Sequence, residues 1–486
     1  MKTQPHSKTK WNGRLVLLVT VAISVLGAAV YLGFYGVPDT PVAEGPDQDK
    51  ASQKPGLPSE KALALKTDLA ALNACFVRLY DANLPSDTKD RALRQEQLGV
   101  AHCLHDAFKQ DAHTLFILAM AYQEQGQSVK AVEYLIECLK LQPDRADAYD
   151  QLGRIAQQKG DHEKAVALFR EAATHDPNMP GIHYRLAEML QAQGELQQAL
   201  IEIEQHTRLN PQRPEGFILW GQISLQRQAY AQAKVAYEKA IQLNPDLPKP
   251  YFSLATVCAR LGLKEASQDY RLRFKEAELA QRQAAKDLRQ SFDPLGITSE
   301  SVAHTHTDVA RIYQAHGKPG QASLLYQRAR MLDPNNITSS IELADLLLRS
   351  GQLTEALAAY QRVVDIQPNQ GVAHFFIGHI HEKLAQWEDA EGAYLKVIEV
   401  TPDRPEGYQA LARFYLERDF SVSRVRDLVD QAIILNPIAE NYYLLAQTCD
   451  RLKECDEALR AVERAIKLAP GHLEYYQFHQ RMRELK

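Results

Sequence analysis

The sequence predicts an all-α protein, a solenoid of about ten helix pairs in two blocks, preceded by one transmembrane helix. Prolines that close helix pairs recur at steps of 34 residues, at Pro143, Pro177, Pro211 and Pro245, and again at Pro334, Pro368 and Pro402. A small residue keeps the same step on the first helices, at Ala119, Gly153, Ala187, Gly221 and Ala255, then at Ala310, Ala344, Gly378, Ala412 and Ala446. Near the N-terminus, residues 15–37 contain no charged side chain.

One repeat shows why these residues form a helix pair. Tyr149, Leu152 and Ala156 follow one another at i, i+3 and i+7, which places them on one face of a first helix. Gly153 on this helix and Ala165 on the second have almost no side chain, so the two backbones can approach closely. A pair of this kind cannot bury its apolar face alone, and it therefore requires neighbours on both sides.

The ends of the two helices are also marked. Gly160 ends the first helix where the chain must turn, and Pro177 stops the second. These positions and spacings resemble the tetratricopeptide repeat, a helix-turn-helix unit, at Tyr149, Leu152, Gly153, Ala156, Gly160, Ala165, Phe169, Ala172 and Pro177. The resemblance implies a superhelical solenoid whose first helices line an inner groove, the default binding surface of the family.

The N-terminal segment is expected to anchor the protein in a membrane. Residues 15–37 are long enough to span a bilayer as a helix, and residues 1–14 carry four basic side chains and no acid. The positive-inside bias places this basic tail in the cytoplasm and the repeats outside it. A cleaved signal peptide is the competing interpretation, although its apolar region would normally be shorter. Residues 38–58, rich in Pro, Gly, Asp and Lys, read as a linker.

The expected location is the inner membrane of a bacterium, with the repeats in the periplasm, because no eukaryotic sorting signal is present. Cysteines can oxidise in that compartment. Cys138, Cys258 and Cys449 occupy small or apolar positions of the repeat and are expected to be buried free thiols. Cys75 and Cys103 are the pair that two adjacent helices could bring together, although the sequence does not determine this pairing.

Before and between the repeat blocks the pattern changes. Residues 59–110 read as two helical stretches, about 59–82 and 87–109, that cap the first repeat. Block one follows at residues 111–262. Residues 263–300 then combine a long second helix with a loop over 291–297, which is read as a spacer in preference to a partner-docking element.

Block two occupies residues 301–472 and ends with a solvating helix at residues 473–486. Its ninth repeat is irregular, because Arg424 and Val425 stand where the other repeats have an alanine. Tight packing of that helix pair is therefore in doubt.

The candidate binding residues are the apolar members of the fifth position of each first helix, which the resemblance places in the groove. Aromatic and aliphatic side chains exposed there could grip an extended or helical peptide. Equally, they could pack in part against the neighbouring repeat. The set is Phe116, Tyr184, Ile218, Phe252, Ile341, Phe375 and Tyr443.

The sequence offers little for catalysis. It has no phosphate-binding loop, nucleophile elbow or HExxH sequence, so no enzyme and no cofactor are predicted. Histidines cluster at His102–His105, but a metal site needs three or four converging ligands, and nothing there provides a third. His374 and His381 share one helix face and are expected to be core and groove residues. The net charge of -5 argues against a nucleic acid partner.

The predicted function is a membrane-anchored scaffold for protein–protein interaction, whose groove binds a peptide segment of a partner. The alternative is a periplasmic chaperone or assembly factor, in cytochrome c maturation or in polysaccharide or envelope machinery. A metal-dependent activity at the His102–His105 cluster ranks third.

Overall fold

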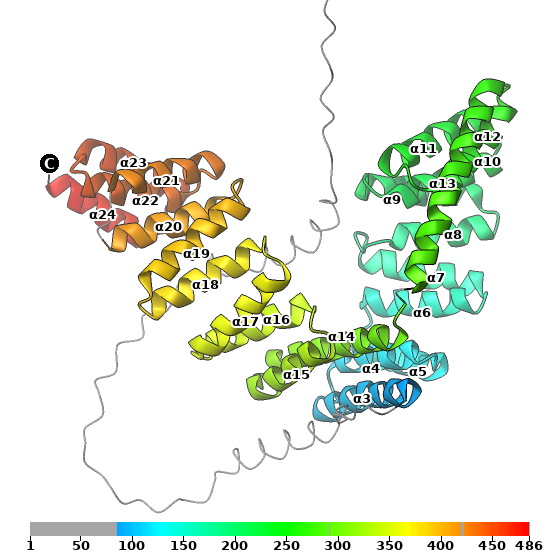
Figure 1. The fold of residues 1–486 in the computed structure, drawn as a ribbon, viewed down its shortest axis with the longest axis horizontal. Helices are drawn as coiled ribbons and strands as arrows, with labels where there is room; N and C mark the ends of the chain where they lie inside the picture. Colours follow the sequence, from blue (N-terminus) through cyan, green and yellow to red (C-terminus); the bar gives the residue numbers. More distant parts are fainter. Residues whose placement is uncertain (1–84, 291, 419–421, 486) are drawn as a thin grey trace, which may run out of the picture. The chain divides into compact units, whose positions relative to one another are not determined.

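A computed structural model of the chain describes residues 85–290, 292–418 and 422–485. Over these residues the protein has 22 α-helices and no strand, which agrees with the predicted all-α solenoid (Figure 1). Each helix packs against the helix that follows it, with the exception of the step from α13 to α14.

The helices alternate between first and second members of ten pairs. The first helices are α4 (Ala112–Glu124), α6 (Ala146–Gln158), α8 (Ile182–Ala192), α10 (Pro214–Gln226), α12 (Pro248–Arg260), α14 (Pro294–Ala315), α16 (Ile337–Arg349), α18 (Gly371–Lys383), α20 (Pro405–Glu417) and α22 (Ala439–Arg451). The second helices are α5 (Ser128–Leu141), α7 (His162–His175), α9 (Leu196–Leu209), α11 (Tyr230–Leu243), α13 (Lys264–Gln290), α15 (Pro319–Leu332), α17 (Leu353–Ile366), α19 (Trp387–Val400), α21 (Val422–Leu435) and α23 (Cys455–Leu468). Two helices lie outside this pattern: α3 (Ser86–Ala107) and α24 (Leu473–Glu484).

Small residues allow the close approach within a pair that the sequence predicts. A Cβ atom on Gly153 would lie only 2.6 Å from the ring of Phe169 on the second helix. The turn residue Gly160 has a φ of +78°, a left-handed conformation that favours glycine. The buried faces of the pairs then join along the solenoid into a series of apolar clusters.

The second helix of the fifth pair is long, as predicted, but the loop expected over residues 291–297 is shorter, because residues 294–297 are helical. Helix α14 already begins at Pro294, with Pro in the first turn, and the Asp293 side chain accepts a hydrogen bond from the Leu295 backbone N–H. Aspartate at the N-cap followed by proline is a strong start signal for a helix. The 27 residues of α13 span about 40 Å, which carries the chain from repeat five to α14.

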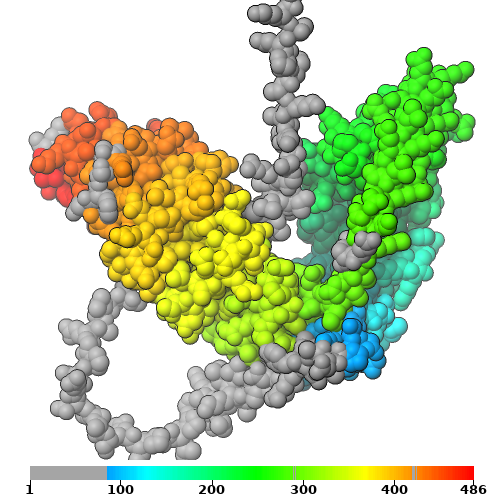
Figure 2. Space-filling model, viewed as in Figure 1, coloured from blue at the N-terminus to red at the C-terminus, as the bar shows by residue number. Residues whose placement is uncertain are grey.

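Helix α3 does more than cap the first repeat. It packs against both α4 and α14, which also contact each other, so sequence-distant parts of the chain lie side by side (Figures 1 and 2). Val100 and Leu104 of α3 join the apolar cluster that contains Val309 and Tyr313 of α14. Block two is therefore joined to the start of block one by packing as well as by the covalent chain.

The irregular ninth repeat packs well, so the doubt about its helix pair is resolved. Val425 is the fourth residue of α21, as Ala131 is of α5, and both are fully buried. The one-residue shift of this repeat thus places Val425, not Arg424, against Leu411 and Phe414 of the cluster.

The predicted burial of three cysteines is confirmed in the described part of the chain. Cys138, Cys258 and Cys449 are buried, as predicted, and Cys103 is half-buried. At the C-terminal end, Tyr475, Phe478 and Met482 of α24 close the last apolar cluster.

Several predictions fall outside the described residues. These are the tail, the apolar segment and the linker of residues 1–58, the first helical stretch of residues 59–82, and Cys75. None of the helices over the described ranges is both long and apolar enough to cross a membrane.

Candidate functional site

The seven predicted groove residues lie on the first helices, and the structure leaves most of them half-buried. Tyr184 packs on the cluster around Leu186 with its ring 5.5 Å from that of His206, and burial raises the pKa of its hydroxyl. The ring of Tyr443 lies 4.7 Å from that of Tyr475, and its hydroxyl donates to Glu474 at 2.9 Å, both on α24.

The remaining half-buried groove residues also contact neighbouring elements. Phe116 lies 4.6 Å from the guanidinium carbon of Arg145, and Phe375 lies 6.1 Å from the ring of Tyr394. Ile218 and Ile341 pack at the edges of apolar clusters. These side chains therefore contribute to packing between helices, and each keeps part of its surface in solvent.

Phe252 differs from the other six, because 59% of its side-chain surface is exposed. It projects from α12 with its ring 5.5 Å from that of Phe274 on α13. The two rings and Pro248 line an open hollow of about 380 Å³. Lys249, Glu278 and Gln281 surround this apolar floor with hydrogen-bonding groups. This arrangement suits a peptide whose apolar side chain contacts the rings while its backbone forms hydrogen bonds with the polar groups.

Polar side chains on the first helices pair between neighbouring repeats. Asp150 of α6 lies 2.7 Å from Nε of Arg185 on α8. Burial raises the pKa of Asp150, although the nearby guanidinium opposes that shift. Likewise, Arg311 of α14 donates to Glu342 of α16 at 3.0 Å. These ion pairs bridge successive repeats, so charged groups on this face are already engaged within the chain.

A buried charged cluster joins α3 to block two. Arg328 of α15 donates two hydrogen bonds of 2.7 Å to the two carboxylate oxygens of Glu96. Nε2 of His306 on α14 lies 3.2 Å from the same carboxylate, and its Nδ1 lies 2.8 Å from the carbonyl oxygen of Val302. Burial alone would raise the pKa of Glu96, but Arg328 and His306 outweigh it and hold that pKa at about 2. Glu96 is thus an ionised carboxylate inside the protein.

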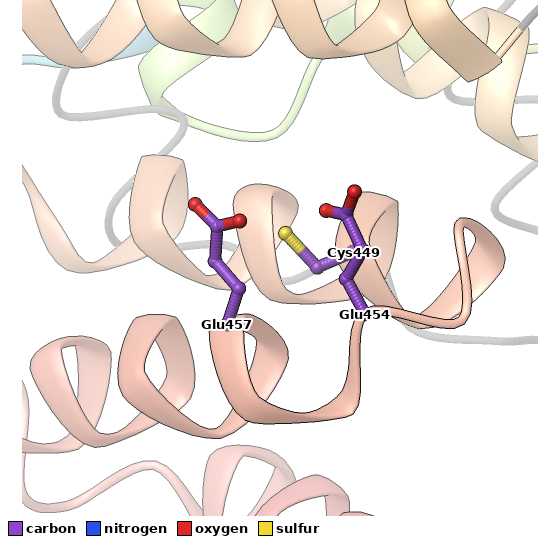
Figure 3. Close-up of side chains that lie close together, drawn as sticks. All are labelled: Cys449, Glu454 and Glu457. Atoms are coloured by element: carbon purple, nitrogen blue, oxygen red, sulfur yellow. The ribbon is translucent and has the colours of Figure 1, made fainter.

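One group over the described residues has the spacing of metal ligands: Cys449 of α22 with Glu454 and Glu457 at the start of α23 (Figure 3). The guanidinium of Arg426 already lies among them, 2.5 Å from Glu457, 3.4 Å from Glu454 and 3.3 Å from the sulfur. Burial also raises the pKa of the Cys449 thiol to about 11, so the sulfur stays protonated beside Arg426. The site therefore suits an internal arginine and not a metal ion.

The histidines that suggested a metal site are engaged elsewhere. Nε2 of His102 lies 2.8 Å from the hydroxyl of Tyr122, and Nδ1 of His105 lies 3.1 Å from that of Thr114. His374 is buried, with Nε2 2.9 Å from the carbonyl oxygen of Pro368, and His381 lies beside Gln386. These contacts are those of structural residues that support helix packing.

Models of the tetratricopeptide repeat match the chain at residues 110–177, 156–219, 217–247, 313–371, 347–414 and 439–472. Together these matches cover more than half of the 486 residues. The chain is a tetratricopeptide repeat protein. The fold of such proteins suggests a scaffold for protein–protein interaction, and they are generally not enzymes.

Solved structures similar to this tetratricopeptide repeat protein share low sequence identity with it. The crystal structure of yeast Tom70 has 17% identity, covers 86% of this chain and 96% of its own, and gives a TM-score of 0.34. MamA from Desulfovibrio magneticus RS-1 has 21% identity, covers 35% of this chain and 97% of its own, and gives a TM-score of 0.34. PilF from Pseudomonas aeruginosa has 20% identity, covers 48% of this chain and 97% of its own, and gives a TM-score of 0.31. No curated protein sequence matches the chain.

Sequence reasoning missed the residues that join the two blocks of this tetratricopeptide repeat protein. Glu96 and Arg328 are 232 positions apart, and α3 lies outside the repeat pattern, so no periodicity relates them. One available signal was that Glu96 stands among Leu93, Val100 and Leu104 on one apolar face of its helix, where an acid requires a buried partner.

Proposed function

We propose that this protein is a membrane-anchored scaffold that binds a peptide segment of a partner on the face formed by its first helices, with Phe252 as the main anchor. The observation that carries the proposal is the exposed ring of Phe252 beside the hollow shared with Phe274. Large exposed aromatic side chains at a hollow with a polar rim are typical of interaction sites. The half-buried rings of Phe116, Tyr184 and Phe375 would extend the contact along the same face.

Membrane attachment is the second part of the proposal. The uncharged run of residues 15–37, preceded by four basic and followed by several acidic side chains, supports an anchor with the repeats on the outer side of a bacterial inner membrane. Carbonate extraction of cells that express the full chain should leave it in the membrane pellet. Removal of residues 1–37 should release it into the soluble fraction, and release of the full chain itself would contradict the anchor.

The peptide site is tested by affinity capture from native membranes with the full chain, followed by mass spectrometry. Phe252→Asp removes the anchor at a position where 59% exposure leaves little packing to lose, so the melting temperature should stay unchanged while the partner is lost. Ile201→Asp is the matched control, because Ile201 is 57% exposed on the second helix α9, away from the first helices.

The outcomes separate the two functions that the sequence suggests. A partner that the Ile201→Asp variant retains and the Phe252→Asp variant loses supports a scaffold with a specific site. Weak capture of many unfolded clients favours the alternative of a periplasmic chaperone or assembly factor. Equal capture of one partner by both variants would contradict binding at Phe252.

A further inference from the structure

A second hollow lies between two second helices of block two, whereas Phe252 lies on a first helix. It has a volume of about 790 Å³ and is formed by α15 and α17, with α16 as its floor. The apolar side chains of Met331 and Leu347 line it together with the side-chain amides of Gln327 and Gln352. Its volume lies within the roughly 300–1,000 Å³ that ligand pockets occupy.

Two arginines line this hollow, one from each of its second helices. Arg330 of α15 and Arg362 of α17 are both half-buried, and Nε of each is buried without a hydrogen-bond partner. Burial, and then the charge of Arg362, lower the pKa of Arg330. Over the described residues, neither guanidinium has an ion pair with a carboxylate. Two half-buried cations that each keep an unmet Nε–H donor would be stabilised by an anion between them.

The acid nearest to the hollow does not neutralise them. Glu355 lines its rim near the start of α17, fully exposed, and accepts a hydrogen bond of 2.7 Å from the hydroxyl of Thr354. That hydrogen bond lowers the pKa of Glu355, so its charge stays at the rim. A ligand with two negative charges would meet more repulsion from Glu355 than a single carboxylate bound by the arginines.

The same junction in the other repeats shows that this pair is unusual. Arg330 is the twelfth residue of α15 and Arg362 is the tenth residue of α17. At five other junctions of consecutive second helices, the matching pairs are Leu139 with Glu171, Ala173 with Gln205, Thr207 with Lys239, Ile241 with Arg273, and Val364 with Lys396. None of these five pairs combines two basic residues, so repeat packing does not require the two arginines.

We infer that the hollow between α15 and α17 binds the carboxylate of a peptide, held by Arg330 and Arg362, with an aliphatic neighbour of that carboxylate against Met331 and Leu347. A guanidinium presents two parallel N–H donors that match the two oxygens of a carboxylate. The amides of Gln327 and Gln352 can pair with the peptide backbone. This site is separate from the face of the first helices on which Phe252 lies, so a partner could contact the protein at two places.

The test uses the full chain and three probes: the peptide acetyl-Ala-Leu-Glu-Leu-Ala-amide labelled with fluorescein, its Leu-Gln-Leu counterpart, and inorganic phosphate. Fluorescence anisotropy at constant ionic strength should show binding of the Glu peptide. The Gln peptide should bind at least ~10-fold more weakly, because it cannot form the charge-assisted pair. Arg330→Gln and Arg362→Gln should each weaken binding of the Glu peptide by a similar factor.

Lys239→Gln is the matched control, since Lys239 is the tenth residue of α11, as Arg362 is of α17, and it should leave binding unchanged. Circular dichroism melts of all variants establish that the fold is retained. Three results would overturn the inference: no binding of the Glu peptide, equal binding by the arginine variants, or displacement by phosphate at a concentration below that of unlabelled peptide.

Discussion

Arg328 and Arg362 occupy the same position, the tenth residue, in the consecutive second helices α15 and α17, yet their surroundings are opposite. Arg328 is 7% exposed and forms two hydrogen bonds to the buried carboxylate of Glu96. Arg362 lines an open hollow together with another arginine. The position in the repeat determines where each guanidinium lies. The neighbouring helix determines which side chain lies beside it.

The neighbouring helix is of a different kind at the two junctions. Arg328 meets α3, a helix outside the repeat pattern, which supplies an acid. Arg362 meets α15, a regular second helix, which supplies a base. A single repeat position therefore yields a structural ion pair at one junction and a candidate ligand site at the next.

The largest effect is expected from breaking the buried pair. Glu96→Gln keeps the size of the side chain but leaves Arg328 as an uncompensated buried charge, which should destabilise the α3 junction by roughly 3–5 kcal/mol. Hydrogen exchange of the full chain should show faster exchange in α3, α14 and α15 than in the wild type. Glu355→Gln, an exposed acid, is the control, and unchanged protection of α3 in Glu96→Gln would contradict the assignment.

Acid should reproduce part of that effect. The pKa of Glu96 is about 2 in the folded protein, against an ordinary value of 4.5. Because the folded pKa is depressed, its stabilisation is complete above about pH 4.5 and is lost as the pH falls from there towards 2. Protection of α3 from hydrogen exchange should thus decrease between pH 5 and pH 3 in the wild type. Glu96→Gln should lack this component, and identical pH profiles would show that Glu96 does not titrate as proposed.

Replacing Arg426, which is less buried than Arg328, should destabilise the protein by an intermediate amount. The Arg426 side chain is 27% exposed and pairs with Asp430, Glu454 and Glu457. The hydrogen bond to Glu457, above all, raises the pKa of Arg426. Solvent screens this cluster more than it screens Glu96, so Arg426→Gln should cost about 1 kcal/mol. Urea denaturation followed by circular dichroism measures the change in the free energy of unfolding. A decrease as large as that of Glu96→Gln would show that burial does not determine how much each ion pair stabilises the fold.

The smallest effect is expected at the unpaired junction. Arg362→Gln removes one of the two positive charges at the hollow, so the free energy of unfolding should stay the same or rise slightly, within about 0.5 kcal/mol. Arg328→Gln, at the matching helix position, should instead lower it by several kcal/mol. If both variants lose stability to the same extent in urea, Arg362 has a structural partner and the comparison fails.

The repeat positions explain how much of the fold the sequence predicts. Small residues such as Gly153 and the closing prolines act within one helix pair, so a 34-residue pattern reveals them directly. The start of α14 at Pro294 was missed, although Asp293 followed by Pro294 is a local signal for a helix start. The contact of α3 with α14 could not be predicted, since it depends on where α13 delivers the chain.

The candidate sites, too, were predictable only where they depend on positions within one repeat. The fifth-position rule places Phe252 on a first helix, but its exposure depends on the neighbouring α13, which departs from the repeat length. The sequence does contain a signal for the Arg330 and Arg362 pair, because aligning second helices by position places two bases at the junction of α15 and α17. The placement of Arg426 among Cys449, Glu454 and Glu457 required the structure, since α21 is shifted by one residue.

The contact between α3 and α14 also has a consequence for folding order. Most contacts of a repeat array are local and form quickly, whereas Gln97 and Thr305, which are hydrogen-bonded at 2.9 Å, lie 208 positions apart. Helix α3 is synthesised first, yet it gains its second partner only after all of block one has emerged from the ribosome. The ionised Glu96 remains hydrated during that interval, which helps to keep the waiting face of α3 soluble until α14 and α15 arrive.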